Sequence, residues 1–220
     1  MKSQFPDETL ERIQSCGVIA VLVIDEADHA VSLAKALLDG GVSAMELTLR
    51  TDAALDALKS VRDRVPEMLA GVGTILTTDQ VQCAFDAGAA FGVAPGLNAK
   101  VVQSAQKIGL PFAPGIVTPS DIESAVELGC RELKFFPAEP SGGMKYLSSI
   151  SAPYQHLGLQ YVPLGGINAT NMTEYLANQN VPAVGGSWIA SRELIAARDW
   201  TAITANATHA RKQIDLLRKK

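Results

Sequence analysis

The chain has 220 residues, of which 47% are hydrophobic and 19% are charged, with a formal net charge of −4. This composition supplies a large core and excludes a disordered chain, and the absence of a Lys/Arg cluster before residues 218–220 excludes a basic surface for nucleic acid or membranes. Barrels of this length commonly form one unit, so we expect residues 1–220 to be a single domain.

Strand-like and helix-like segments alternate along the chain. The expected strands are 18–24, 44–49, 68–72, 91–94, 111–113, 133–136, 161–164 and 181–184. Helical patterns occur at 8–15, 27–38 and 52–61, from 79, 98 and 119, and at 144–150 and 200–217. Strands that alternate with helices predict a parallel sheet. Eight such strands predict an α/β fold of the closed (β/α)8 type, a TIM barrel, with a short extra N-terminal helix and a C-terminal helix.

The cysteines and the N-terminal residues indicate a cytoplasmic protein without a metal. Cys16, Cys83 and Cys130 are far apart and lack the spacing of a zinc site or a disulfide framework. Cys83 and Cys130 lie in apolar patterns and are expected in the core. Residues 1–7 lack the apolar stretch of a signal peptide, and no apolar run reaches transmembrane length. No nucleotide-binding motif occurs, so we expect no cofactor.

Glycine-bearing turns are expected after several strands. They are Gly73-Thr74, Pro95-Gly96, Pro114-Gly115, Gly165-Gly166 and Gly185-Gly186. The last two follow the seventh and eighth strands, where many (β/α)8 barrels bind phosphate through backbone N–H groups. Glycine lets the backbone approach an anion closely. These two turns therefore predict a phosphate site.

Lys134 lies in the apolar run 131–137. Lysines in strands most often face water, and an exposed alternation with Glu132 is the simplest interpretation. In a parallel barrel, however, both faces of a strand are buried, and a charged residue near the carboxyl end of a strand points into the barrel mouth. Burial disfavours the ammonium form, and a neutral amine attacks carbonyl groups. We therefore expect Lys134 to be a nucleophile.

The second expected strand supplies a carboxylate and a cation. Glu46 and Thr48 alternate onto one face of it, and a buried Glu46 needs a polar partner such as Lys134. A purely structural Glu46–Lys134 ion pair is the alternative, although such pairs stabilise weakly. Arg50 could bind a carboxylate or simply begin a helix at the surface. Together with the phosphate turns, these groups fit Schiff-base carbon–carbon chemistry on a phosphorylated oxo acid.

Six segments in chain order resemble one known family. They are 46–51, 71–74, 94–97, 134–139 followed by Gly142-Gly143, 165–167 and 185–188. They resemble the 2-keto-3-deoxy-6-phosphogluconate (KDPG) aldolases and the related 4-hydroxy-2-oxoglutarate aldolases over nearly the whole chain. The resemblance implies a class I, metal-independent aldolase of the Entner–Doudoroff pathway, an aldehyde-lyase that releases pyruvate and glyceraldehyde 3-phosphate. It also implies a homotrimer.

The resemblance further implies a role for each site residue. Lys134 would form the Schiff base with the C2 ketone, and Glu46 would act as the general base and acid. The remaining residues would bind the pyruvate carboxylate (Arg50, Thr74), shape the pocket (Pro95, Phe136) and hold the phosphate (Gly165, Gly166, Gly186, Ser187).

Two other functions stay open at this point. Leu164 stands where gluconate-type enzymes usually have Thr and galactonate-type enzymes have Val. A galactonate-type (2-dehydro-3-deoxy-6-phosphogalactonate) aldolase or a broad 4-hydroxy-2-oxoglutarate aldolase is therefore one alternative. The other is a non-catalytic phosphate-binding barrel in which the Lys134–Glu46 pair is structural.

Overall fold

The computed structural model describes residues 3–219, and strands and helices alternate along them as predicted. The strands are β1 (Val18–Leu22), β2 (Ala44–Thr48), β3 (Leu69–Gly73), β4 (Gly92–Val93), β5 (Phe112–Ala113), β6 (Gly115–Ile116), β7 (Glu132–Phe135), β8 (Gln160–Pro163) and β9 (Val184–Gly186). The α-helices are α1 (Asp7–Cys16), α2 (Ala30–Asp39), α3 (Ala54–Arg64), α4 (Thr78–Asp86), α5 (Ala99–Ile108), α6 (Pro119–Glu127), α7 (Gly143–Ser151), α8 (Met172–Leu176), α9 (Arg192–Ala196) and α10 (Trp200–Arg218). Two 3₁₀ helices are η1 (Ala27–His29) and η2 (Ala152–Leu157).

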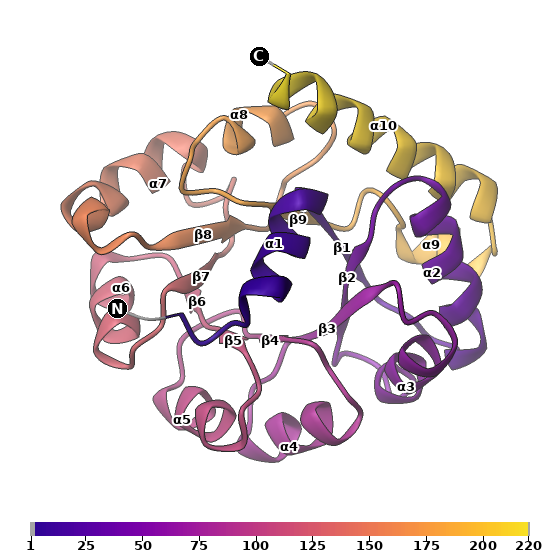
Figure 1. Cartoon of the computed structure of the whole chain (residues 1–220), viewed down its shortest axis with the longest axis horizontal. Coiled ribbons are helices and arrows are strands. Elements are labelled where there is room, and N and C mark those ends of the chain that lie inside the picture. The colour runs from indigo at the N-terminus through magenta and orange to yellow at the C-terminus, as the bar shows by residue number, and fades with distance from the viewer. Residues whose placement is uncertain (1–2, 220) are drawn as a thin grey trace.

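The strands pair in parallel in two sheets. The larger sheet has the order β5-β4-β3-β2-β1-β9, and the smaller has the order β6-β7-β8. β5 and β6 are separated only by Pro114, and an isolated parallel bridge joins Leu164, after β8, to Gly185 in β9. The molecule is therefore an α/β fold in which parallel strands curl inside a layer of helices (Figure 1).

The sequence explains why the helices begin and end where they do. Thr77 and Thr118 form capping boxes that satisfy the first backbone N–H groups of α4 and α6. Gly17 and Gly109 end α1 and α5 in the left-handed conformation, which glycine adopts without strain. β2 and β3 are buried along their whole length, as expected for parallel strands covered on both faces.

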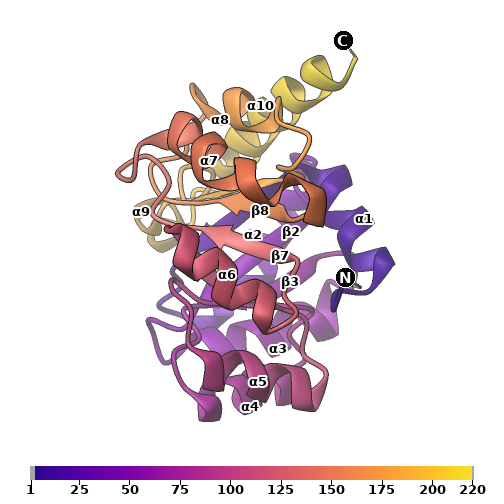
Figure 2. The same ribbon diagram turned by 90° about the vertical axis from the view of Figure 1, so that its left-hand side faces the viewer.

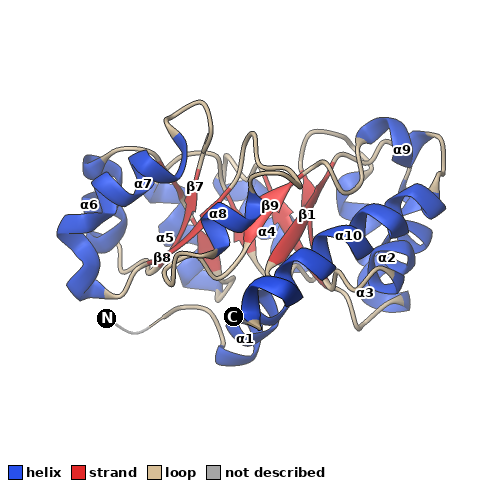
Figure 3. Ribbon diagram, turned by 90° about the horizontal axis from the view of Figure 1, so that it is seen from above, coloured by secondary structure: helices blue, strands red, loops and turns tan. Residues whose placement is uncertain are grey.

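Both terminal helices that the sequence predicts are present, as α1 and α10. α1 lies across the strands in Figure 1 and beyond one of their ends in Figure 3. Its Leu10 and Ile13 line an interior cavity of about 40 Å³ that also contacts Glu132. α10 packs on α2, where Thr204 Oγ1 donates to the Ala36 carbonyl at 2.9 Å. In Figure 2, α10 lies at the opposite edge of the molecule from α4 and α5.

Some local predictions are wrong. Gly115 is predicted in a turn, but it begins β6 and pairs with Lys134. Pro114 lacks an N–H group, yet proline is compatible with extended backbone, so the chain continues as a strand after it. The Gly185-Gly186 pair lies in β9, which begins later than the predicted strand at 181–184. Cys83, expected in the core, is exposed. The short helices α8 and α9 were not expected. Between residues 3 and 219, no helix is long and apolar enough to cross a membrane.

Candidate active site

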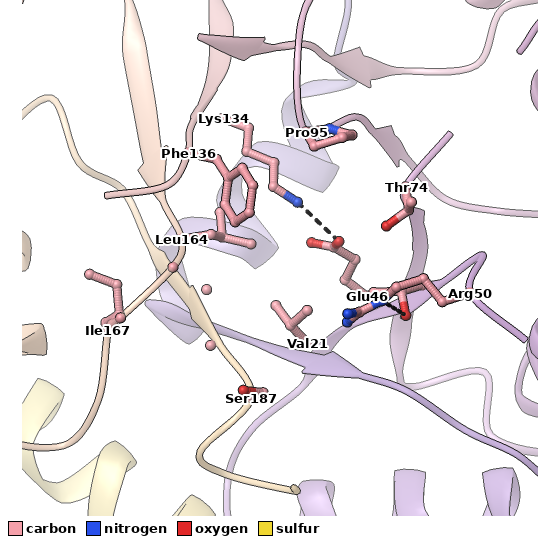
Figure 4. Close-up of a pocket in the computed structure, with 15 residues that line it drawn as sticks. Val21, Glu46, Arg50, Thr74, Pro95, Lys134, Phe136, Leu164, Ile167 and Ser187 are labelled. Carbon is pink, nitrogen blue, oxygen red and sulfur yellow. Dashed lines mark hydrogen bonds and ion pairs between the residues drawn. The ribbon is translucent and has the colours of Figure 1, made fainter. Parts of the chain in front are cut away.

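A pocket of about 350 Å³ opens where the parallel strands end. Every site residue predicted from the sequence lines it, namely Glu46, Arg50, Thr74, Pro95, Lys134, Phe136, Gly165, Gly166, Gly186 and Ser187. The other lining residues are Val21, Thr48, Leu164, Ile167 and Gly185. Of these, the sequence connected only two with the site: Gly185 as part of a phosphate turn, and Leu164 as a position that bears on substrate preference. Residues from widely separated parts of the chain thus meet in one cavity (Figure 4).

A buried ion pair lies in the middle of this pocket. Lys134 Nζ, on β7, donates to Glu46 Oε1, on β2, at 3.2 Å, and only 8% and 3% of the two side chains are exposed. Lys134 Nζ also lies 5.5 Å from the centroid of the Phe136 ring, within the range of a cation–π contact. The pair places an amine and a carboxylate within direct proton-transfer distance, shielded from bulk water.

Gly73 makes the space in which the Glu46 carboxylate lies. A Cβ atom added at Gly73 would stand 1.8 Å from Glu46 Oε1 and 2.5 Å from its Cδ. Only glycine on β3 therefore leaves room for the Glu46 carboxylate in this position. Sequence reasoning assigned Gly73 to a turn and missed this function. A glycine inside a strand is the signal that could have indicated a close approach.

Polar groups from β2 and β3 form one end of the pocket. Thr48 Oγ1 donates to the Leu22 carbonyl at 3.0 Å and accepts from Arg50 Nε at 3.2 Å, so it orients the guanidinium. Thr74 has a φ of 61°, a left-handed conformation that β-branched residues rarely adopt. Figure 4 shows its hydroxyl turned towards Glu46. A strained residue in such a place is typical of a functional site.

The turn after β8 forms the opposite end of the pocket. Its backbone carbonyls accept hydrogen bonds from neighbouring segments of the chain. The Leu164 and Gly165 carbonyls accept from the backbone N–H groups of residues 138 and 139 at 2.7 and 3.0 Å. The Gly166 carbonyl accepts from Asn171 Nδ2 at 3.1 Å. In a trans peptide the N–H group points opposite to the carbonyl. The N–H groups of residues 165, 166 and 167, each of which follows one of these carbonyls, therefore point away from the hydrogen bonds just described.

Glycine is required on both walls of this end. Gly165 and Gly166 have φ values of 94° and 83°, and successive N–H groups in such turns form concave anion-binding nests. On the adjoining strand β9, a Cβ atom at Gly185 would stand 2.6 Å from Leu164 Cγ, and one at Gly186 would stand 1.9 Å from the Trp188 ring. Ser187 adds a hydroxyl on the same side (Figure 4). This end can bind an anion with backbone and hydroxyl donors.

The donor set fits covalent catalysis on a small ligand with an anion at each end. Its central groups are one amine and one carboxylate, the pair that imine chemistry needs. Within the described part of the chain, no group of three or more His, Cys, Asp or Glu side chains could hold a metal ion.

Known proteins share both the sequence and the fold. A family model described as KDPG and KHG aldolase matches residues 10–206. The chain is 40% identical to the 2-dehydro-3-deoxy-phosphogluconate aldolase of Haemophilus influenzae, over 89% of the chain and 92% of that protein. It is 39% identical to the KHG/KDPG aldolase of Escherichia coli K12, over 91% of the chain and 93% of that protein.

A solved structure of KDPG aldolase from Legionella pneumophila, with pyruvate captured at low pH as a covalent carbinolamine intermediate, is similar with a TM-score of 0.87 and 36% identity. The match covers 92% of this chain and 97% of that one. The family model spans most of the chain, and relatives close to 40% identity cover it almost fully. The chain therefore belongs to the KDPG and KHG aldolase family.

Proposed function

We propose that this protein is a class I aldolase that cleaves 2-dehydro-3-deoxy-6-phosphogluconate (KDPG) to pyruvate and glyceraldehyde 3-phosphate. The observation that carries the proposal is the buried Lys134–Glu46 pair, 3.2 Å apart, in a pocket with anion-binding groups at both ends. Its volume of about 350 Å³ suits a small metabolite.

Lys134 is the nucleophile in this proposal. Glu46 accepts a proton from the Lys134 ammonium, and the free amine attacks the C2 ketone of the substrate to give a carbinolamine. Glu46 then returns this proton to the carbinolamine hydroxyl, which leaves as water, so that a protonated imine forms and Glu46 is a carboxylate again. The imine is the electron sink for the next step, so one difficult cleavage becomes a series of easier reactions.

Glu46 is the general base for the cleavage itself. It removes the proton of the C4 hydroxyl, the C3–C4 bond breaks, and the bonding electrons move to C3 to form an enamine as the aldehyde leaves. Protonation at C3 gives the pyruvyl imine, and water releases pyruvate and restores the amine. General base catalysis of this kind contributes roughly 10²–10⁴-fold to the rate.

The remaining pocket residues bind the two ends of the substrate. Arg50, oriented by Thr48, and Thr74 bind the carboxylate next to the ketone. Pro95 and Phe136 form the walls around the imine. The phosphate lies against the backbone of Gly165, Gly166 and Gly186 and the Ser187 hydroxyl, where positive φ values and close packing support an anion nest.

The finer features of the fold belong to the same proposal. A closed (β/α)8 barrel is supported by the continuity of β5 with β6 across Pro114 and by the bridge from Leu164 to Gly185. A single domain over residues 1–220 is supported by one cluster of buried apolar residues that runs from Phe5 to Ile214. The resemblance also favours a cytoplasmic location and a homotrimer. Light scattering of the purified protein tests the oligomeric state directly.

A pyruvate-release assay coupled to lactate dehydrogenase tests the activity. The wild type should cleave KDPG, and Lys134→Ala should not, while its thermal unfolding stays cooperative. A phosphate-binding barrel without catalysis would bind phosphorylated acids and release no pyruvate. If Lys134→Ala cleaved KDPG at the wild-type rate, the proposal would be wrong.

Substrate preference is the second question for the same assay. Leu164 places an apolar side chain in the pocket next to Gly165. The Haemophilus influenzae relative is named for phosphogluconate alone, and the Escherichia coli relative is named for both KHG and KDPG. We expect kcat/KM to favour KDPG over its C4 epimer, 2-dehydro-3-deoxy-6-phosphogalactonate, and over 4-hydroxy-2-oxoglutarate. A strong preference for the galactonate epimer would overturn the gluconate assignment.

A further inference from the structure

A buried tyrosine behind the phosphate turn is not used by the chemistry above. The side chain of Tyr175, on α8, is fully buried, and its hydroxyl donates to Glu139 Oε1. Burial and this hydrogen bond hold the pKa of Tyr175 well above its ordinary value. The phenol therefore stays neutral and acts as a donor. Glu139 is otherwise exposed, so one buried hydroxyl holds an exposed carboxylate in place.

Glu139 lies directly against the turn assigned to the phosphate. Its backbone N–H donates to the Gly165 carbonyl at 3.0 Å. A Cβ atom added at Gly166 would stand 2.6 Å from Glu139 Cβ and 2.8 Å from its Cγ. The aliphatic part of Glu139 is therefore the wall behind Gly166. The same segment follows Lys134 and Phe136 in the chain, so it connects the phosphate end of the pocket to the imine end.

The carboxylate of Glu139 needs restraint in this position. A negative charge that is free to turn towards the pocket mouth would oppose a phosphate dianion bound at Gly166. Tyr175 holds the carboxylate on the side of α8. Gly143 encloses the contact, because a Cβ atom there would stand 3.3 Å from Glu139 Oε1 and 3.4 Å from the Tyr175 hydroxyl.

We propose that Tyr175 is a positioning residue for the phosphate end of the pocket. By holding Glu139 against Gly166 it keeps the turn in its anion-binding shape and the carboxylate away from the bound phosphate. The Tyr175–Glu139 pair therefore sets the affinity for phosphorylated 2-oxo acids and leaves the pyruvate end unaffected. This inference rests on the proposed aldolase function.

Tyr175→Phe tests it, with Tyr154→Phe as a matched control. Tyr154 also donates its hydroxyl to a glutamate, Glu123, at 2.9 Å, and neither residue lines the pocket. Tyr175→Phe should raise the KM for KDPG about tenfold, the size of a lost hydrogen bond to a charged group. The pyruvate concentration that gives half-maximal inactivation by borohydride should not change, because pyruvate carries no phosphate. Tyr154→Phe should match the wild type in both measurements.

Two substitutions at the exposed partner keep the test valid if Tyr175→Phe folds poorly. Glu139→Asp retains the charge but is too short to keep the hydroxyl contact, so it should also raise the KM for KDPG. Glu139→Gln can still accept from Tyr175 and removes the charge, so its KM should not exceed that of the wild type. An unchanged KM for KDPG in both Tyr175→Phe and Glu139→Asp overturns the inference. So does an equal rise in the KM for KDPG and in the pyruvate concentration that gives half-maximal inactivation by borohydride. Failure of the wild type to cleave KDPG would instead refute the proposed function.

Discussion

Gly73→Ala should remove catalysis by displacing the general base. The added Cβ atom would stand 1.8 Å from Glu46 Oε1, whereas ordinary contact begins at 3.4 Å. The carboxylate oxygen therefore has to move by 3.4 − 1.8 Å, about 1.6 Å. The clash falls on the flexible end of a side chain, so Glu46 moves more easily than the paired backbone of β3. A displacement of about 1 Å in an active site can lower a rate about 100-fold.

We therefore expect kcat for KDPG to fall about 100-fold or more in this variant. The coupled pyruvate assay measures the rate, and thermal unfolding shows whether the strand remains intact. Gly96→Ala is the control, because a Cβ atom at Gly96, in the turn after Pro95, meets nothing within 4 Å. Wild-type kcat in a folded Gly73→Ala protein would refute the argument that the position of Glu46 depends on Gly73.

Three further predictions concern other parts of the molecule. Arg50→Ala should raise the half-saturating concentration of pyruvate in borohydride inactivation about tenfold, because the carboxylate loses a charged donor; an unchanged value would place the carboxylate elsewhere. Burial raises the pKa of Glu132 above its ordinary value of 4.5, so the folded state loses stability as the pH rises through that raised pKa. Glu132→Gln should therefore raise the melting temperature at pH 7 and not at pH 4, and an equal shift at both would contradict this. In the folded protein, thiol reagents should modify the exposed Cys83, whereas buried Cys16 and Cys130, the latter with its pKa raised to about 11 by burial, should react only after unfolding.

The proposed catalytic residues could be predicted because both faces of a parallel strand are buried. A charged side chain near the carboxyl end of such a strand therefore points into the pocket. Lys134 and Glu46 each lie in an apolar strand pattern, and the alternation of strands with helices removes the solvent face of both strands. Their contact across 88 residues of sequence follows from that constraint. An exposed alternation with Glu132 would place both side chains in water, and both are buried.

The supporting residues could not be predicted, because their functions depend on distances between strands. The space that Gly73 leaves for Glu46 and the left-handed conformation of Thr74 arise only when β2 and β3 lie side by side. The contact between Tyr175 and Glu139 depends on α8, whose five residues are too few for a periodic pattern to reveal. The Pro114-Gly115 pair is likewise typical of a turn, and only the pairing of Gly115 with Lys134 shows that extended backbone continues there.

The central claim is that Lys134 forms an imine with the oxo acid. Incubation of the folded protein with pyruvate and borohydride, followed by peptide mass spectrometry, tests it most directly. We predict one reduced pyruvyl adduct, on Lys134, that is lost in Lys134→Ala. An unmodified Lys134 after this treatment, or an adduct on another lysine with cleavage retained in Lys134→Ala, would contradict the mechanism.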